Sequence, residues 1–241
     1  MAGPVAGQPH FVLAQEHLSR VRAARKVVAL CRRVVVLAEG RRRGVWLTLI
    51  VGVGLLLAGC TVAEAPSSPD IATWRAEKDR YMRESPESPV PEAKRAGFPP
   101  LPYYAIDPAY RVAASLTLAP GDQVLELPTS TGQRRKMRKI GALRFTLKGQ
   151  ELALTAFVDA ETNDLRRLFV PFGDLTSGTE TYPGGRYLDL DRTATGIYDL
   201  DFNRGYHPFC VFNAKYDCPY PPKENRLPIP VRAGERLPPG P

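Results

Sequence analysis

The second half of the chain alternates short apolar runs with glycine, aspartate and proline, a pattern typical of β-strands joined by turns. The clearest pair of runs lies at 143–147 and 152–156, where apolar residues occupy every second position on both sides of Lys148, Gly149 and Gln150. A strand directs alternate side chains to opposite faces, so this pattern predicts an antiparallel hairpin with one buried face. Gly149 can supply the positive φ that a tight hairpin turn requires.

The apolar runs and one helical segment together define the expected fold class. The runs lie at 110–118, 123–127, 142–147, 151–158, 167–172, 186–190, 196–201, 208–212 and 227–232. Before them, apolar and long side chains at helical spacing predict one helix, with Asp70 as its N-cap and an end near residue 84. We therefore expect a mainly β domain, an antiparallel β-sandwich or partly open barrel with one N-terminal amphipathic helix.

Two other stretches are expected to lie outside regular structure. Six prolines between residues 86 and 102 exclude a continuous helix or a central strand, and they predict an extended wrap. The basic run at 134–139 predicts a solvated loop, which on a tethered domain could also contact anionic lipid or wall polymer.

The N-terminal part carries an export signal. An uncharged apolar run at 45–59 follows Arg41, Arg42 and Arg43 and ends in Leu-Ala-Gly directly before Cys60. This run is shorter than the roughly 20 residues of a membrane-spanning helix, and its basic flank and small-residue exit resemble a bacterial lipoprotein signal. We expect cleavage before Cys60 and a lipid on that cysteine, so that the protein faces outside the cytoplasm on the cell membrane or envelope. An uncleaved anchor that extends the run to residue 63 has the same topology and stays open.

These signals divide the chain into four parts. Residues 1–59 form a basic extension and the signal segment, 60–70 a flexible tether rich in proline, serine and alanine, 71–236 a single β-rich domain, and 237–241 a tail. The basic extension is either a cytoplasmic segment or the product of a start codon set too far upstream, with translation beginning near 34–36. We favour the second interpretation.

The net charge of +8 would ordinarily suggest a nucleic-acid partner. Nine lysines and arginines but only Glu16 and Glu39 lie before residue 61, so the exported part is almost neutral. We therefore expect no nucleic-acid partner, and a membrane partner through the lipid anchor.

A glycine-rich loop at 171–186 holds the first candidate chemistry. Asp174 and Glu180 could act as an acid and base pair, with Arg186 holding an anionic group through its planar fork. The same residues can equally cap turns and form an ion pair. We favour this structural interpretation, because spacing alone does not bring the carboxylates together.

A second polar cluster begins at Asp199. In a strand, Asp199, Asp201 and Asn203 would share one face and could bind a divalent cation, although such residues more often cap turns. Asp201 is a third candidate acid or base. The residues expected to line a polar binding pocket with the glycine-rich loop are Arg186, Asn203, Arg204, Tyr206 and Asn225.

Cys210 and Cys218 are the cysteines of the exported domain besides Cys60. In an oxidising compartment such a pair usually forms a disulfide, which we predict, with reduced thiols as the alternative. A zinc site that adds His207 lacks a fourth ligand, so we expect no metal and no cofactor. Nucleophilic catalysis has little support, since His207 is the only histidine after residue 60.

Three stretches together resemble a known bacterial family. They are F-G-D-L-T-S-G-T-E-T-Y-P-G-G-R-Y-L at 172–188, L-D-F-N-R-G-Y-H-P-F-C at 200–210, and C-P-Y-P-P-K-E-N-R-L-P-I-P-V-R-A-G-E-R at 218–236. The family is domain of unknown function 1684, and the resemblance covers roughly 74–236. It implies frequent export, often as a lipoprotein, and no established activity. The family pattern usually has Asn where this chain has His207, which implies that its chemistry does not depend on an imidazole.

The leading functional hypothesis is a lipid-anchored extracytoplasmic domain that binds an unknown small molecule or envelope ligand. One alternative is an envelope hydrolase or transferase that uses Asp174, Glu180 or Asp201 as acid and base. The other is a structural envelope scaffold. Carboxylates gathered in a concave site would favour the enzyme, whereas carboxylates scattered around separate turns would favour the scaffold.

Overall fold

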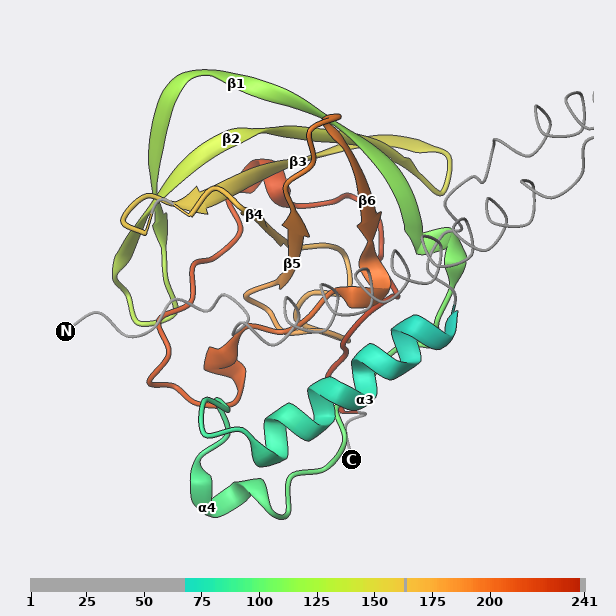
Figure 1. Cartoon of the computed structure of the whole chain (residues 1–241), viewed down its shortest axis with the longest axis vertical. Coiled ribbons are helices and arrows are strands. Elements are labelled where there is room, and N and C mark those ends of the chain that lie inside the picture. The colour runs from blue at the N-terminus through green and yellow to red at the C-terminus, as the bar shows by residue number, and fades with distance from the viewer. Residues whose placement is uncertain (1–67, 163, 239–241) are drawn as a thin grey trace, which may run out of the picture. The chain divides into compact units, whose positions relative to one another are not determined.

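The computed structural model describes residues 68–162 and 164–238, which form one compact unit with a curved sheet as its main element (Figure 1). The predicted signal segment, Cys60 and most of the predicted tether lie outside these residues. Within the described part of the chain, no helix is both long enough and apolar enough to cross a bilayer.

Six strands form a single antiparallel sheet in the order β5-β4-β3-β2-β1-β6. Their bounds are Arg111–Pro128 (β1), Arg134–Leu147 (β2), Gln150–Asp159 (β3), Arg167–Phe172 (β4), Arg186–Asp191 (β5) and Ile197–Asp201 (β6). A bridge between Tyr187 in β5 and Tyr206 just after β6 brings the two ends of the sheet together. The sheet therefore curls into a nearly closed barrel, which confirms the mainly β fold class and its barrel form.

The predicted hairpin is confirmed as β2 and β3. Leu143 pairs with Leu154 and Leu147 pairs with Gln150, so Lys148 and Gly149 form a two-residue turn. Both have positive φ, 51° and 78°, which is the geometry that a tight hairpin turn of this twist demands.

Several predicted strand boundaries were wrong. The first two runs form one long strand, β1, whose pairing with β2 shifts register between Leu118 and Gln123. The basic run at 134–139 lies in β2 rather than in a loop, and Met137 within it is buried. The run at 208–212 forms the 3-10 helix η3, Phe209–Val211. The run at 227–232 is not a strand, because Pro228 and Pro230 cannot donate ladder hydrogen bonds.

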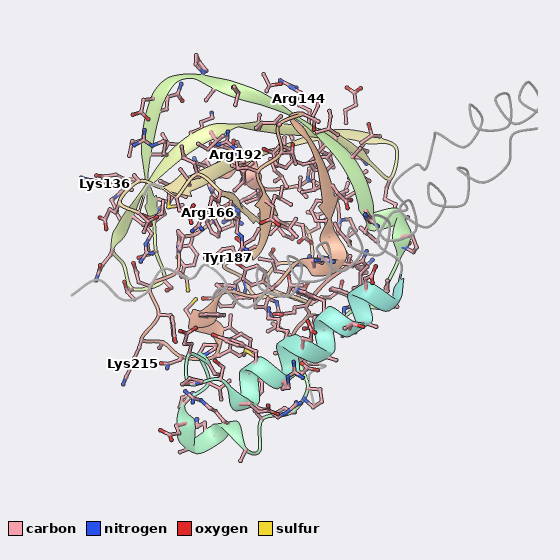
Figure 2. All side chains as sticks on the ribbon, in the orientation of Figure 1. Lys136, Arg144, Arg166, Tyr187, Arg192 and Lys215 are labelled. Carbon is pink, nitrogen blue, oxygen red and sulfur yellow. The ribbon has the colours of Figure 1, made fainter. Side chains whose placement is uncertain are left out.

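Alternate side chains of all six strands point into the barrel, and Figure 2 shows the enclosed space filled with side chains. Leu154, Leu168 and Leu200 are fully buried there. Segment 227–233 adds Val231 and other apolar residues to the same core. Burial of these side chains is the main source of stability, on the order of 1.5–3 kcal/mol for each large one.

Helix α3, Ser68–Glu84, confirms the predicted amphipathic helix and begins two residues before Asp70. Its Tyr81 and Met82 pack against Tyr187 and Tyr206, on the face of β5 that points away from the barrel core. Besides η3, the other helices among residues 68–162 and 164–238 are short: α4 Glu92–Arg95, η1 Pro108–Tyr110, η2 Phe202–Arg204 and η4 Lys223–Asn225.

Candidate functional site

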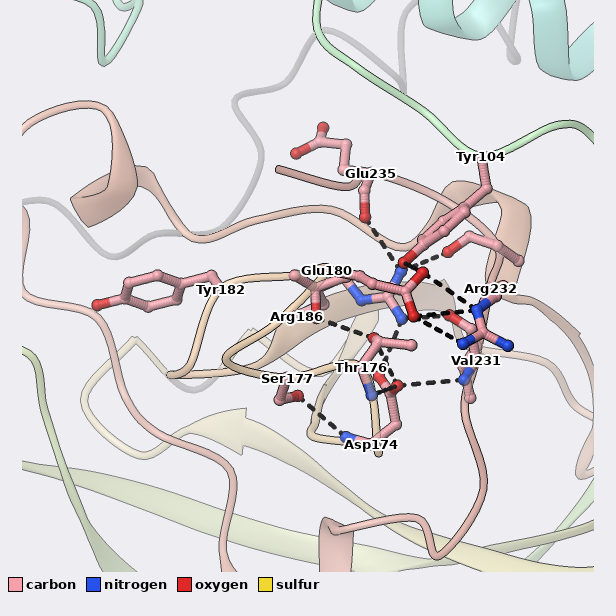
Figure 3. Close-up of polar contacts among 12 residues, drawn as sticks. Tyr104, Asp174, Thr176, Ser177, Glu180, Tyr182, Arg186, Val231, Arg232 and Glu235 are labelled. Carbon is pink, nitrogen blue, oxygen red and sulfur yellow. Dashed lines mark hydrogen bonds and ion pairs between the residues drawn. The ribbon is translucent and has the colours of Figure 1, made fainter. Parts of the chain in front are cut away.

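Arg186, at the start of β5, is the centre of the glycine-rich loop region and is fully buried (Figure 3). Its Nη2 donates to Asp174 Oδ2 at 2.9 Å and to the carbonyl oxygen of Val231 at 2.6 Å. Its Nη1 donates to the carbonyl oxygens of Ala233 and Glu235. The guanidinium therefore fastens the loop and the C-terminal segment to each other and has little capacity left for a ligand.

Asp174 uses both carboxylate oxygens inside the protein. Oδ2 pairs with Arg186, and Oδ1 accepts from the backbone N–H of Thr176 at 2.8 Å, from its hydroxyl at 2.6 Å, and from Val231 N at 3.1 Å. With its side chain 1% exposed, Asp174 cannot touch a substrate. Its role in this structure is to cap the turn, as the structural interpretation predicted.

Glu180 lies near this cluster but at the surface. The Glu180 carboxylate accepts hydrogen bonds from Nη2 and Nε of Arg232, at 2.8 and 3.0 Å, and from the hydroxyl of Tyr104 at 3.1 Å. The hydrogen bond from Arg232 holds the pKa of Glu180 below its usual value. A carboxylate held ionised in this way is a poor general acid.

Asp201 and Asn203 lie at η2, separate from the glycine-rich loop. Asp201 Oδ1 accepts from Asn203 N and Nδ2, both at 2.9 Å. Asn203 also bonds the backbone N–H and carbonyl of Asp107, at 3.0 and 2.9 Å. Arg204 Nε lies 4.0 Å from Asp201 Oδ2. These side chains hold η2 against the segment before β1.

Asn225 and Tyr206 lie in two further places, and each makes its own set of hydrogen bonds. Asn225 Nδ2 donates to the carbonyl oxygens of Thr155 and Pro171, and its Oδ1 accepts from Thr155 N at 2.7 Å. The Tyr206 hydroxyl donates to Asp189 at 2.8 Å. The residues predicted to form one polar pocket are therefore distributed over separate structural contacts: Asn225 bonds the start of the glycine-rich loop, whereas Asp201 and Tyr206 bond other parts of the chain. Asp174, Glu180 and Arg186 lie together within the loop region.

His207 is buried beneath the glycine-rich loop. Its Nε2 accepts the backbone N–H of Tyr182 at 3.3 Å, and its Nδ1 lies 3.7 Å from Glu235 Oε2. Burial lowers the pKa of His207 to about 4, so the ring is neutral at pH 7. Within residues 68–162 and 164–238, no three histidine, cysteine or acidic side chains are placed to hold a metal ion.

Cys210 and Cys218 lie next to each other, and both are free thiols. The backbone N–H of Cys210 donates to Cys218 Sγ at 3.3 Å, and Cys210 Sγ lies 3.9 Å from the hydroxyl of Tyr182. A hydrogen bond from Cys218 is the main cause that lowers the pKa of Cys210 to about 6, while the pKa of Cys218 is raised.

A cavity of about 130 Å³, which we call the β3–β4 cavity, has none of these residues in its lining, although the Tyr206 hydroxyl binds Asp189, which lines it. It opens where β3 and β4 diverge beyond their single registered pair, Phe157 opposite Phe169. Its lining residues come from β2, β3, β4, β5 and two loops: Arg135, Met137, Val158, Asp159, Thr162, Asp164, Arg167, Phe169, Asp189 and Pro219.

The sequence analysis missed this cavity. Its polar residues are spread from Arg135 to Asp189 and none belongs to the predicted pocket. The alternation in β4 does place Arg167 and Phe169 on one face, opposite Leu168 and Val170, but it does not show that this face is partly uncovered.

The fold and the buried arginine define a small antiparallel barrel whose C-terminal segment is held by Arg186. A family described as Protein of unknown function (DUF1684) matches residues 96–236, more than half of the chain. The chain therefore belongs to the DUF1684 family. No curated protein matches it.

A similar solved structure is that of an uncharacterized protein of Haloarcula marismortui, determined in solution by NMR. It is 38% identical, with a TM-score of 0.56, and the match covers 70% of this chain and 93% of that chain. That protein therefore consists almost entirely of the matched region.

Proposed function

We propose that this protein is a ligand-binding domain, held outside the cytoplasm by a lipid on Cys60, and that its ligand occupies the β3–β4 cavity. The observation that carries the proposal is the lining of that cavity. Charged side chains of both signs line an open volume together with the apolar residues Met137, Phe169 and Pro219, and a small-molecule site likewise combines apolar walls with polar groups that orient the ligand.

The two alternatives have less support. The acid and base pair predicted in the glycine-rich loop lacks a shared open space, because Asp174 is buried in hydrogen bonds and Glu180 is held by Arg232. The internal contacts of the motif residues are what a scaffold requires. A scaffold gives no reason, however, for a cavity lined with arginine and aspartate.

Location outside the cytoplasm rests on the arginines at 41–43, the apolar run and Cys60. Replacing Cys60 by Ala tests it: labelling of the wild-type chain with a radioactive fatty acid should be lost in the variant. Label retained by Cys60→Ala, or none on the wild type, would refute the lipid anchor.

The adjacent thiols of Cys210 and Cys218 support a disulfide in the exported protein. Its formation releases two protons and passes two electrons to a disulfide oxidant of the outer compartment. Protein purified from that compartment under non-reducing conditions should be lighter by two hydrogens than the reduced chain. An unchanged mass, with both thiols open to alkylation after unfolding, would contradict the bridge.

Native mass spectrometry of residues 61–241 tests the binding function directly. We expect a bound small molecule after gentle purification, and its loss from the Asp189→Asn variant but not from Asp122→Asn. Asp122 is a suitable control because it is an exposed partner of Arg138 and lies outside the cavity lining. A retained compound that Asp189→Asn does not release would argue against the cavity as its site.

A further inference from the structure

We infer that the β3–β4 cavity takes a neutral, hydroxyl-rich ring compound the size of a single sugar. This inference rests on the proposed function and specifies the ligand of the same site. Three features of the lining support it: charged residues of both signs, hydrogen-bond donors and acceptors, and apolar residues that include an aromatic ring.

Charges of both signs line the cavity. Arg135 lies 3.3 Å from Asp217, and Arg167 Nε lies 3.6 Å from Asp191. Asp159 and Asp189 line the same space. A ligand with one net charge would meet like charge on part of the wall, which is costly in a partly buried site. Asp164 lines the cavity as well and is paired with Arg166. Guanidinium and carboxylate groups therefore face the same space, and a ligand with both hydrogen-bond donors and acceptors can serve them.

The arginines provide donors. The distance from Arg167 to Asp191 exceeds that of a hydrogen bond, and within the described residues the Arg167 guanidinium donates none. Arg135 Nη2 donates to Asp217, whereas its Nη1 is buried without a partner in the described part of the chain. An atom buried to this degree is not reached from the cavity, so the donors open to a ligand are those of Arg167, and a ligand rich in oxygen atoms can accept from them.

The aspartates provide acceptors in fixed orientations. Asp189 is oriented by the Tyr206 hydroxyl at 2.8 Å. Asp159 Oδ1 accepts from the backbone of Glu161 and Thr162 at 2.9 and 3.0 Å, which fixes its carboxylate. A hydroxyl group both donates and accepts, so one polyhydroxy compound can serve the arginines and the aspartates together.

The apolar lining residues and the cavity volume limit the shape and size of the ligand. Met137, Phe169 and Pro219 are apolar, and the Phe169 ring is held edge to face against Tyr187 with 4.6 Å between centroids. A fixed aromatic ring can pack against the C–H face of a sugar. The volume of about 130 Å³ is on the order of ten times the ~10–15 Å³ that one water needs. That is room for one ring with its hydroxyls.

Saturation-transfer difference NMR of residues 61–241 tests the inference. The neutral probes are glucose, galactose, mannose, arabinose and N-acetylglucosamine; the charged probes are acetate, glutamate and glycine betaine. We expect at least one neutral probe to bind, with a Kd at least 10-fold weaker in both Arg167→Met and Asp189→Asn. Asp122→Asn should leave the Kd unchanged. The two cavity variants come from different strands, so that a folding defect in one does not remove the test.

The other outcomes separate the inference from the proposed function. If charged probes bind, the cavity variants weaken them and no sugar binds, the neutral-sugar inference is overturned while the cavity remains a binding site. If a sugar binds equally well to wild type and both folded variants, the sugar does not use this cavity and the inference fails. If no probe binds, the inference is overturned, and only a compound retained in native mass spectrometry would then keep the proposed function.

Discussion

Arg186 and Asp174 form an ion pair with 2.9 Å between Nη2 and Oδ2, and their side chains are 0% and 1% exposed. The same guanidinium donates to three carbonyl groups of the C-terminal segment. The aspartate and arginine of the motif, which at first suggest catalysis, thus connect the glycine-rich loop to the C-terminal segment through buried hydrogen bonds.

Replacing Arg186 by Met should lower the free energy of unfolding by roughly 3–5 kcal/mol, because Asp174 and three carbonyl groups would stay buried without their donor. Urea unfolding followed by circular dichroism measures this loss. Glu180→Gln is the matched control: its partner Arg232 is 57% exposed, so the variant should lose less than about 1 kcal/mol. Equal losses of unfolding free energy in the two variants would show that Arg186 does not stabilise the C-terminal segment as described.

Gly234 lies between two of the carbonyl groups that bind Arg186, and its φ is 78°. A Cβ there would lie 2.7 Å from Phe202 O and still closer to Gly205 O. Gly234→Ala should therefore cost more than about 2 kcal/mol, since backbone strain and a clash with backbone atoms add together.

Gly121→Ala separates the two contributions to this cost. Gly121 also has positive φ, 67°, but has open space around it. The control should therefore lose only about 1 kcal/mol from strain. Thermal unfolding of both variants gives the comparison, and a Gly234→Ala protein as stable as Gly121→Ala would refute the close approach.

Stability should depend on the protonation of His207. Its pKa is about 4 in the folded protein against a usual 6.5, so the unfolded chain binds the extra proton between these values. Stability from this group is fully present above pH 6.5 and falls as the pH drops towards 4, by up to roughly 3 kcal/mol.

The His207→Asn variant isolates that effect. Asn does not titrate, so the difference in unfolding free energy between pH 7 and pH 4.5 should be smaller in the variant than in the wild type. Urea titrations at the two pH values measure it. An identical difference in both proteins would mean that His207 is not buried in its neutral form.

In the reduced protein, Cys210 should react with iodoacetamide faster than Cys218. A hydrogen bond from Cys218 lowers the pKa of Cys210 to about 6, whereas the pKa of Cys218 is raised. The thiolate is the reactive form, so the alkylation rate of Cys210 should rise with a midpoint near pH 6. Cys218→Ser should move the midpoint upward, and peptide mass mapping assigns the site. Preferential labelling of Cys218 would contradict this arrangement.

The fold class could be predicted because local pattern and burial agree. In β2 and β3, Leu143 and Leu154 follow strict alternation around Gly149, and the structure pairs them directly. Helix α3 was equally clear from its spacing. The basic strand was missed because a run of arginine and lysine usually indicates a loop. These side chains can also lie on a strand, where their aliphatic parts cover the sheet and their charges stay in water.

The candidate site could be predicted only in part. A motif shows which residues are close in the sequence, but a site depends on which residues are close in the folded chain. The glycine-rich loop does bring Asp174 and Arg186 into contact, but Asn225 lies with Thr155 and Asp201 with Asn203. The cavity depends on where β3 and β4 diverge, which is set by tertiary packing rather than by local sequence.

The most direct test of the central claim is to locate the bound ligand by ¹H–¹⁵N correlation NMR of residues 61–241, titrated with the neutral and charged probes together. The account predicts that amide shifts concentrate at the cavity, at Met137, Asp159, Phe169 and Asp189, while the loop at 174–186 stays unchanged. Shifts concentrated in that loop, with the cavity amides unmoved, would contradict it.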